Sequence, residues 1–175
     1  MDRTQLTALQ DPLKQRYRTA PEAALITLHA SGALDQGALA CNIDSGRRVA
    51  DALAQAGLHP AAGGDGSQLC SGDMLLEALV ACAGVTLAAV ATAVGVELRG
   101  GEVRAEGDLD FRGTLGVDRE APVGFTAIRL AFRIDAEVTD DQIATLAKLT
   151  ERYCVVYQTL RAGVPTTSTL ERMHG

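Results

Sequence analysis

Residues 78–96, ALVACAGVTLAAVATAVGV, form nineteen consecutive positions without a charged side chain. This length meets the requirement of about twenty apolar residues for a membrane-spanning helix. Alanine is the commonest residue of the stretch, however, whereas membrane spans are typically rich in leucine, isoleucine and phenylalanine and carry aromatic anchors. The chain has no tryptophan, and acidic residues flank the stretch at Asp73, Glu77 and Glu97. Because small residues let helices pack closely, we expect a buried central helix and no membrane partner.

The composition of the chain is typical of a soluble globular protein. Its 175 residues are 47% hydrophobic and 22% charged, enough for one domain with a substantial core. The net charge of -6 and the lack of a basic cluster with interleaved aromatics oppose binding to a phosphate backbone, so we expect no nucleic-acid partner. The first twenty residues lack the apolar core of a signal peptide, which indicates a cytoplasmic protein.

The spacing of apolar residues predicts an α+β fold in a single domain, residues 1–175, with a short N-terminal helical extension at about 1–22. Two alternating runs joined through Asp35, Gln36 and Gly37 have the spacing of a β-hairpin. We expect a peripheral helix at 11–24, the hairpin strands at 23–32 and 37–46, and a glycine-rich connection at 47–68. The central helix follows at 72–94, two long strands at 97–113 and 124–138, and a last helix at 140–163. Residues 166–173 are consistent with a final strand.

Cap residues predict where the two main helices begin and end. Ser71 and Asp73 place a hydroxyl and a carboxylate at the start of the central helix, where backbone N–H groups are unpaired, and Gly95 ends it. Thr139 or Asp140 caps the last helix, which we expect to run through residue 153 into CVVYQTLRAG.

Four cysteines carry the candidate chemistry of the chain. None forms a short metal-type pair with another, and the three histidines are scattered, so the sequence predicts no zinc site and no other cofactor. The chain is also large for a disulfide-stabilised secreted scaffold. Free cysteine is among the most buried residue types, so buried structural thiols are the alternative to a reactive site. These cysteines are Cys41, Cys70, Cys82 and Cys154.

Two segments together resemble one known family. SGDMLLEALVACAGVTLAAVA, followed after two β runs and an acidic helix by LTERYCVVYQTL, is similar to osmotically inducible protein C and the organic hydroperoxide resistance proteins, the OsmC-like family. The resemblance covers roughly residues 23–170 and includes the order of the elements. It implies an intertwined homodimer in which antiparallel sheets wrap two long central helices, with active sites at the subunit interface.

The resemblance also implies a reaction. In active members of the family a thiolate reduces an organic hydroperoxide and becomes a sulfenic acid, a second cysteine converts it to a disulfide, and a lipoylated protein or another dithiol reduces the disulfide. At the matching positions, Cys82 is the attacking thiol and Cys154 the resolving thiol. Because a buried thiol has a raised pKa, a positive charge or a hydrogen-bond donor must hold the thiolate.

The sequence departs from the family at the residues that supply this support. Active members carry an arginine in the loop of the first hairpin and a glutamate ten residues before the first cysteine. Here the loop has no arginine, and the second position is Gly72, with Asp73 one residue later. Asp73 either replaces the glutamate or is an ordinary acid at a helix start. Arg47 with its neighbour Arg48 either supplies the cation or is a solvated pair.

Other residues near the two motifs have alternative interpretations. Arg152 is a further candidate cation, and Val155 stands where the family usually has a proline. Glu77 is five residues from Cys82, a rotation of about 140° on a helix, so we expect it not to share a face with that thiol. Cys70 is either an inert loop thiol or a competing disulfide partner, and Cys41 is expected in the core.

Three functions therefore follow from the sequence as hypotheses. The first is a thiol-dependent peroxidase that reduces organic hydroperoxides through Cys82 and Cys154 in oxidative stress defence. The second is an OsmC-like homodimer without efficient peroxidase activity that binds a small apolar ligand at the subunit interface. The third is a structural or regulatory dimer whose cysteines are core residues.

Overall fold

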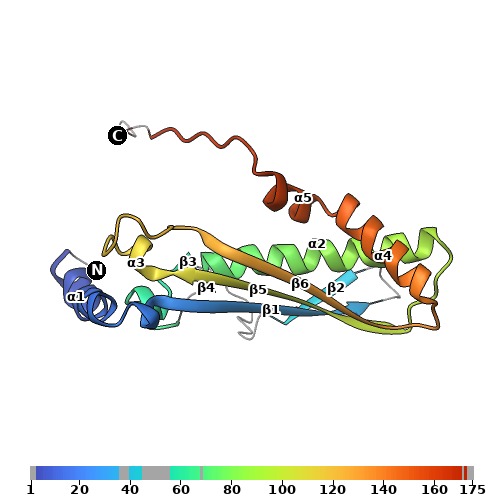
Figure 1. Ribbon diagram of the computed structural model, residues 1–175, viewed down its shortest axis with the longest axis horizontal. Helices are drawn as coiled ribbons and strands as arrows, with labels where there is room; N and C mark the ends of the chain where they lie inside the picture. The colour runs from blue at the N-terminus through green and yellow to red at the C-terminus, as the bar shows by residue number, and fades with distance from the viewer. Residues whose placement is uncertain (1–2, 36–39, 45–55, 68, 171, 173–175) are drawn as a thin grey trace.

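A four-stranded antiparallel sheet runs along one side of a long helix, α2 (Ser71–Ala93), in the computed structural model (Figure 1). The structure describes residues 3–35, 40–44, 56–67, 69–170 and 172. The other helices are α1 (Arg3–Thr19), α3 (Phe111–Thr114), α4 (Asp140–Tyr153) and α5 (Val155–Ala162), with 3-10 turns η1 (Pro21–Ala24) and η2 (Pro60–Ala62). The strands are β1 (Leu25–Asp35), β2 (Ala40–Asp44), β3 (Ala56–Gly57), β4 (Leu69–Cys70), β5 (Gly100–Asp110) and β6 (Phe125–Asp135).

The sheet has the order β2-β1-β5-β6, and each neighbouring pair is antiparallel. The pairing of Ser31 with Asp44 and of Asp35 with Ala40 confirms the predicted hairpin. The mixed α and antiparallel β class predicted from the sequence is also confirmed. Two residues of β3 pair with β4 in parallel, in the connection that enters α2.

The two faces of the sheet differ in chemistry. Val103 and Ala105 of β5 are buried under α2, and the alternating residues of β6 on the same face include Phe132. The opposite face carries ion pairs between strands: Arg129 of β6 binds Asp108 at 2.5 Å. One face is therefore the core and the other faces solvent, as the period-two pattern of these strands predicted.

Strands β5 and β6 approach each other closely where the Phe125 ring packs at the end of the hydrophobic core. Gly107 lies beneath Phe125, and a Cβ atom added at Gly107 would overlap the Phe125 ring. A register shift at Asp108 and Leu109 in the same ladder displaces β6 locally. The absence of a side chain at Gly107 thus lets Phe125 lie across the sheet toward α2.

Helix α2 begins at Ser71 and ends at Ala93, within one residue of the predicted bounds. Gly95, with a φ of 73°, terminates it in the left-handed conformation that glycine adopts at little cost. By length and composition α2 could cross a membrane, but half of its apolar window is buried inside the chain against the sheet and the last two helices. Such burial is typical of a core helix, although Val85 remains 42% exposed.

The N-terminal helix α1 spans Arg3–Thr19, so it lies within the helical extension expected at about 1–22 but begins and ends earlier than the helix expected at 11–24; Pro21–Ala24 forms η1. Tyr17 is buried and donates its hydroxyl to the carbonyl of Ala61 at 2.8 Å. This bond ties α1 to the part of the 47–68 connection that the structure describes. Residues 45–55 and 68 of that connection lie outside the described residues.

A short corner after β5 contains the most buried carboxylate of the described chain. Asp110 is 4% exposed and caps α3 by accepting from the N–H of Arg112. The Arg112 guanidinium binds both oxygens of Asp110, with one N–O distance of 2.6 Å, and reaches Asp118 at 3.4 Å. Arg112 thereby holds the pKa of Asp110 below its usual range, against the effect of burial.

Two predictions about the C-terminal part of the chain are wrong. The last helix does not run through residue 154, because Cys154 has a ψ of 108° and separates α4 from α5. Of the strand predicted at 166–173, residues 166–170 form no strand: they find no ladder partner among the described residues, are exposed and extend away from the body (Figure 1), while residues 171 and 173 lie outside the described residues. An alternating polar sequence requires a neighbouring strand edge to become a strand, and no such edge lies beside this segment within the described chain.

Candidate functional site

Cys82 lies in the middle of α2, on the side of the helix that faces the junction of α4 and α5. Its side chain is half-buried and packs against the core cluster that includes Leu79 and Cys154. The preceding helical turn contributes Leu79, which is fully buried, because residues three apart share a helix face. The apolar periodicity of α2 thus places this thiol at the edge of the core rather than on the open surface.

Cys154 lies at the junction itself, where it is the C-cap of α4 and the N-cap of α5. Its N–H donates to the carbonyl of Thr150 at 2.9 Å, which closes α4, and its sulphur accepts from the N–H of Tyr157 at 3.4 Å, which caps α5. The side chain is fully buried. Because the backbone at Cys154 is extended, the first N–H groups of α5 have no carbonyl partners within the helix and point toward the thiols.

The fold brings the two thiols within hydrogen-bonding range of each other. Burial disfavours the Cys82 thiolate, but the N–H groups of Val156 and Val155 and the thiol of Cys154 donate to its sulphur. Together the donors hold the pKa of Cys82 below its ordinary value of 9.0. Burial raises the pKa of Cys154 to about 11, and the adjacent Cys82 thiolate contributes to the rise. The pair therefore has one thiol suited to nucleophilic attack and one that stays protonated.

Thr86, one turn after Cys82, has a hydroxyl that can serve either of two acceptors. It donates to the carbonyl of Cys82 at 2.7 Å, and it also contributes to the lowered pKa of the Cys82 thiol. A hydroxyl has a single hydrogen, so it stabilises the thiolate only when it leaves the carbonyl. We therefore attribute the lowered pKa chiefly to the two backbone N–H groups and to Cys154.

No arginine or lysine among the described residues contributes to the lowered pKa of Cys82. Arg47 and Arg48, the candidate cations of the sequence analysis, lie outside the residues that the structure describes. Arg152 is exposed and places its guanidinium 5.5 Å from the centroid of the Tyr153 ring. Within the part of the chain that the structure describes, only neutral donors stabilise the thiolate.

The structure does not bring Asp73 to the thiol pair within this chain. Asp73 lies in the first turn of α2, nine residues before Cys82, which corresponds to a rise of about 13.5 Å and a rotation of about half a turn. Its charge acts on Glu77 instead. Burial is the main cause that raises the pKa of the Glu77 carboxyl, and the charge of Asp73 raises it further.

The remaining two cysteines lie apart from the pair. Cys70 is half-buried directly before α2, twelve residues before Cys82, and its thiol is free. Cys41 is a residue of β2, and its side chain is not among those that the structure describes. The described residues contain no group of three or more histidine, cysteine or acidic side chains that could hold a metal ion.

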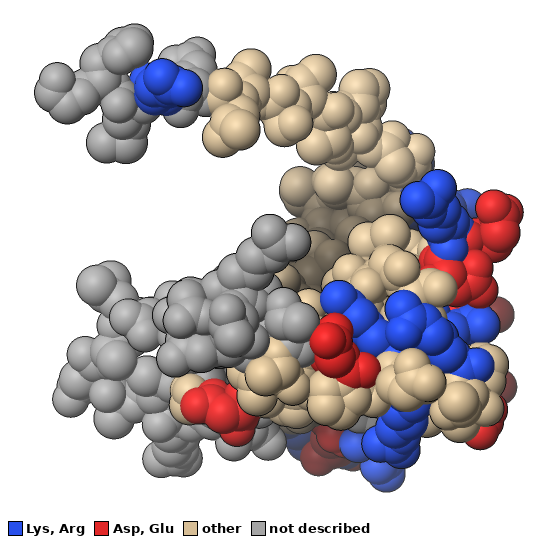
Figure 2. Space-filling view, turned by 90° about the vertical axis from the view of Figure 1, so that its left-hand side faces the viewer, with Lys and Arg blue, Asp and Glu red and all other residues tan. Residues whose placement is uncertain are grey.

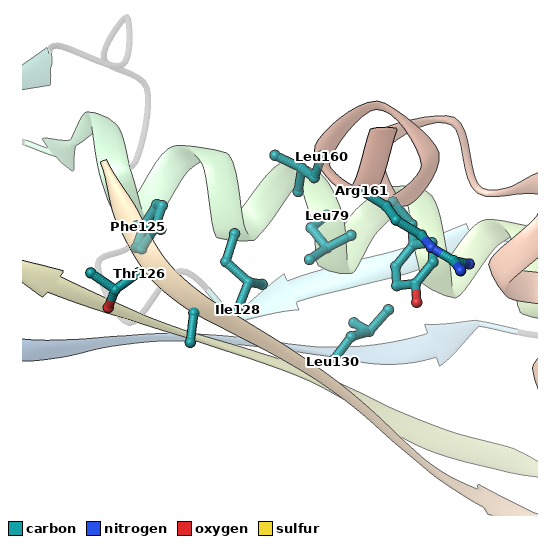
Figure 3. A pocket seen from close by; sticks show the side chains of 9 residues that line it. Leu79, Phe125, Thr126, Ile128, Leu130, Leu160 and Arg161 are labelled. Atoms are coloured by element: carbon teal, nitrogen blue, oxygen red, sulfur yellow. The ribbon is translucent and has the colours of Figure 1, made fainter. Parts of the chain in front are cut away.

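An apolar pocket of about 360 Å³ adjoins the thiol pair. It opens between α2, β6 and α5, and Figure 3 shows Leu79, Ile128 and Leu160 pointing toward one another from these three elements. The described residues that line it are Leu79, Phe125, Thr126, Ala127, Ile128, Leu130, Tyr157, Leu160 and Arg161. Tyr157 links the pocket to the thiols, since its N–H binds Cys154 while its side chain lines the cavity.

A second hollow lies on the other side of the pair, between α2 and α4. It has a volume of about 380 Å³ and includes Thr86 and Tyr153. Its other lining residues, Val85, Ala89, Val90, Ala93, Val94 and Leu149, are all apolar. The thiol pair thus lies between two apolar hollows, and among their described lining residues only the first hollow has a charged one.

The sequence analysis missed the groups that hold the thiolate. The N–H groups of Val155 and Val156 are exposed to the sulphur only because the helix breaks at Cys154, and backbone donors leave no residue-type signature. The one local sign of the helix break was that Val155 and Val156 are both β-branched, since such residues lower helix propensity slightly. Arg161 and Tyr157 were missed because their approach to β6 is tertiary.

Comparison with family models identifies one family. Residues 64–169 match the family model described as OsmC-like protein. The crystal structure of an OsmC-like hydroperoxide resistance protein from Jannaschia sp. CCS1 aligns with a TM-score of 0.57 over 87% of this chain and 95% of that chain. The sequences are 14% identical, so this likeness concerns the fold alone. No curated protein matches the sequence.

Proposed function

This chain belongs to the OsmC-like protein family, and from that premise we propose that it is a thiol-dependent peroxidase that reduces organic hydroperoxides through Cys82 and Cys154. One contact supports this activity above all others: a thiol with a lowered pKa lies within hydrogen-bonding range of a second, protonated thiol. The hydroperoxide resistance protein with the same fold is consistent with it.

The arrangement accounts for each step of the reaction. The Cys82 thiolate attacks the terminal oxygen of the hydroperoxide, the O–O bond breaks, and Cys82 becomes a sulfenic acid while an alkoxide leaves. Cys154 is protonated at neutral pH because its pKa is raised, so it can give its proton to the alkoxide. The resulting Cys154 thiolate attacks the sulphur of the sulfenic acid, hydroxide leaves, and a disulfide forms.

Return to the reduced state needs two electrons from outside the chain. We assign this step to a dithiol or lipoylated-protein reductant, since a dithiol supplies both electrons by thiol–disulfide exchange and forms a disulfide itself. A cytoplasmic homodimer remains part of the proposal. The exposed apolar side chains of α2, Leu75 and Val85, are consistent with contact to a second subunit.

The experiment that tests the proposal is thiol consumption by the reduced protein, freed of reductant, with cumene hydroperoxide and with hydrogen peroxide. We expect rapid loss with the organic hydroperoxide, slower loss with hydrogen peroxide, and a Cys82–Cys154 disulfide in the peptide map. Cys82→Ser should abolish the reaction, while Cys70→Ser should leave it unchanged. Slow oxidation without selectivity, or a disulfide through Cys70, would contradict the proposal.

A second function is favoured by one specific observation. The Cys82 thiolate has no cationic neighbour among the described residues, and the pocket beside it is apolar. An OsmC-like protein with this site could bind a small apolar ligand without efficient peroxidase chemistry. Ligand binding that persists in a protein that consumes no hydroperoxide is the result that would favour this second function.

A further inference from the structure

We propose that Arg161 makes the pocket beside the thiols selective for chain-like ligands that end in a carboxylate. The apolar chain lies among the side chains of α2, β6 and α5, and the carboxylate binds the guanidinium of Arg161. The inference deepens the proposed function by naming a substrate class for the same site, but ligand binding itself requires neither thiol.

The lining of the pocket supports an apolar chain. Leucine, isoleucine, phenylalanine and alanine side chains make up most of it, and they come from three separate elements that the core holds in place. A cavity of about 360 Å³ holds on the order of a dozen non-hydrogen atoms at about 30 Å³ each. This is the size of a ten-carbon carboxylate rather than of a long lipid chain.

The charge of the pocket supports an anionic end. Among the described residues that line the pocket, Arg161 alone is charged, and none of them is acidic. Figure 3 shows its side chain extending from α5 away from Leu160, along the edge of the pocket. A planar guanidinium next to an apolar cavity matches a carboxylate attached to a hydrocarbon chain, because it can donate two parallel hydrogen bonds.

Arg161 differs from the well-paired arginines of the described chain. Arg99 binds Asp135 at 2.8 Å, Arg112 binds Asp110 at 2.6 Å, and Arg129 binds Asp108 at 2.5 Å. Among the residues that the structure describes, Arg161 has no carboxylate or other acceptor within bonding distance and is exposed. Its donors are therefore available to a ligand, on a chain whose net charge of -6 otherwise repels anions.

Because the pocket lies beside the thiols, its selectivity for a carboxylate would also decide which hydroperoxides react. Leu79 lines the pocket one turn before Cys82, and Tyr157 lines it while donating its N–H to Cys154. The segment after α5 projects from the body and leaves this side hollowed in the space-filling view (Figure 2). A chain anchored at Arg161 would thus lie beside the thiols, so its hydroperoxide group could reach Cys82.

The test measures binding in a protein that cannot react. Decanoate and its neutral counterpart decanol are titrated calorimetrically into the Cys82→Ser chain, alone and combined with Arg161→Gln. We expect decanoate to bind more tightly than decanol, and Arg161→Gln to weaken decanoate by about tenfold or more while leaving decanol unchanged. The matched control is Arg133→Gln, which removes the same charge from the solvent face of β6 and should change neither affinity.

Activity separates this inference from the proposed function. In the chain with both cysteines, Arg161→Gln should raise KM about tenfold for a hydroperoxide that carries a carboxylate, and by a much smaller factor for cumene hydroperoxide, which has no carboxylate. Equal affinity for decanoate and decanol, or an equal effect of Arg133→Gln, would overturn the role of Arg161. Neither result would touch the peroxidase proposal, which is tested separately by thiol consumption and by the Cys82–Cys154 disulfide.

Discussion

Asp110 and Cys82 are two acidic groups whose pKa is lowered despite their burial, and their charged forms are stabilised in different ways. Asp110 is almost fully buried, and both of its oxygens are bound by the Arg112 guanidinium. Cys82 is half-buried, and its sulphur is bound by two backbone N–H groups and the thiol of Cys154, without a cation among the described residues. The carboxylate has a full counter-charge, whereas the described residues around the thiolate supply only dipoles.

The difference separates a structural anion from a reactive one. A bidentate arginine saturates a carboxylate and fixes its position, which suits a corner that must hold β5 against α3. Backbone dipoles lower a thiol's pKa without neutralising its charge, so the sulphur remains nucleophilic. The predictions that follow test this contrast between Asp110 and Cys82.

The largest effect should come from removing the partner of the reactive anion. Cys154→Ser should retain a single turnover and leave Cys82 as a sulfenic acid, while steady-state turnover falls at least about 100-fold because no disulfide can form. Serine is a preferred N-cap, so α5 should persist. Stopped-flow kinetics and mass spectrometry after trapping of the sulfenic acid measure both results. Undiminished steady-state turnover would show that another thiol resolves Cys82.

The next effect concerns the structural anion. Arg112→Met removes the cation and leaves Asp110 buried, which should destabilise the fold by roughly 2–3 kcal/mol, less than for a fully buried pair because Arg112 is one-quarter exposed. Urea unfolding measures it, with exposed Arg119→Met as a control that should change stability by less than about 0.5 kcal/mol. The initial rate of thiol oxidation should be unchanged. A parallel loss of that rate would contradict the distinction between Asp110 as a structural anion and Cys82 as the reactive one.

The pH dependence of stability gives the same variant a second readout. Because Arg112 lowers the pKa of Asp110, the pair stabilises the native chain above the ordinary carboxylate pKa of about 3.9. This contribution is lost as the pH falls through the native pKa of Asp110. Arg112→Met should therefore remove part of the acid sensitivity of unfolding, whereas Arg119→Met should retain it.

The reactive anion should determine the pH dependence of the first step. The pKa of Cys82 lies below 9.0, so the rate constant for its oxidation should be high above that pKa and fall about tenfold per pH unit below it. Single-turnover kinetics and thiolate absorbance should give the same midpoint. A midpoint at or above 9.0 would mean that burial outweighs the backbone donors.

The smallest effect should come from removing one donor. Val155→Pro deletes an N–H that points at Cys82 and introduces the residue that the family usually has there. Proline suits the first position of a helix, and the extended backbone of Cys154 suits a residue before proline. The pKa of Cys82 should rise and the rate near neutral pH should fall about threefold to tenfold. Val155→Ala, which keeps the N–H, is the control and should leave both quantities unchanged.

The sequence by itself determined most of the fold. The uncharged, alanine-rich stretch gave α2 to within a residue, and period-two alternation gave β5, β6 and the hairpin, because these patterns record directly which face of each element is buried. It also marked Cys82 and Cys154 as the thiols to consider. Residues 166–173 misled the same reasoning, since a strand depends on a neighbour that the segment itself does not encode.

Only the tertiary structure decided how the thiols are supported. The break at Cys154 turns the N–H groups of Val155 and Val156 toward Cys82, and α2 separates Asp73 from that thiol by nine residues. The packing of α5 over β6 creates the pocket and brings Arg161 to its edge. Backbone donors and cavities arise from how the elements are placed against one another, so they carry no residue-type signal, whereas burial of a side chain does.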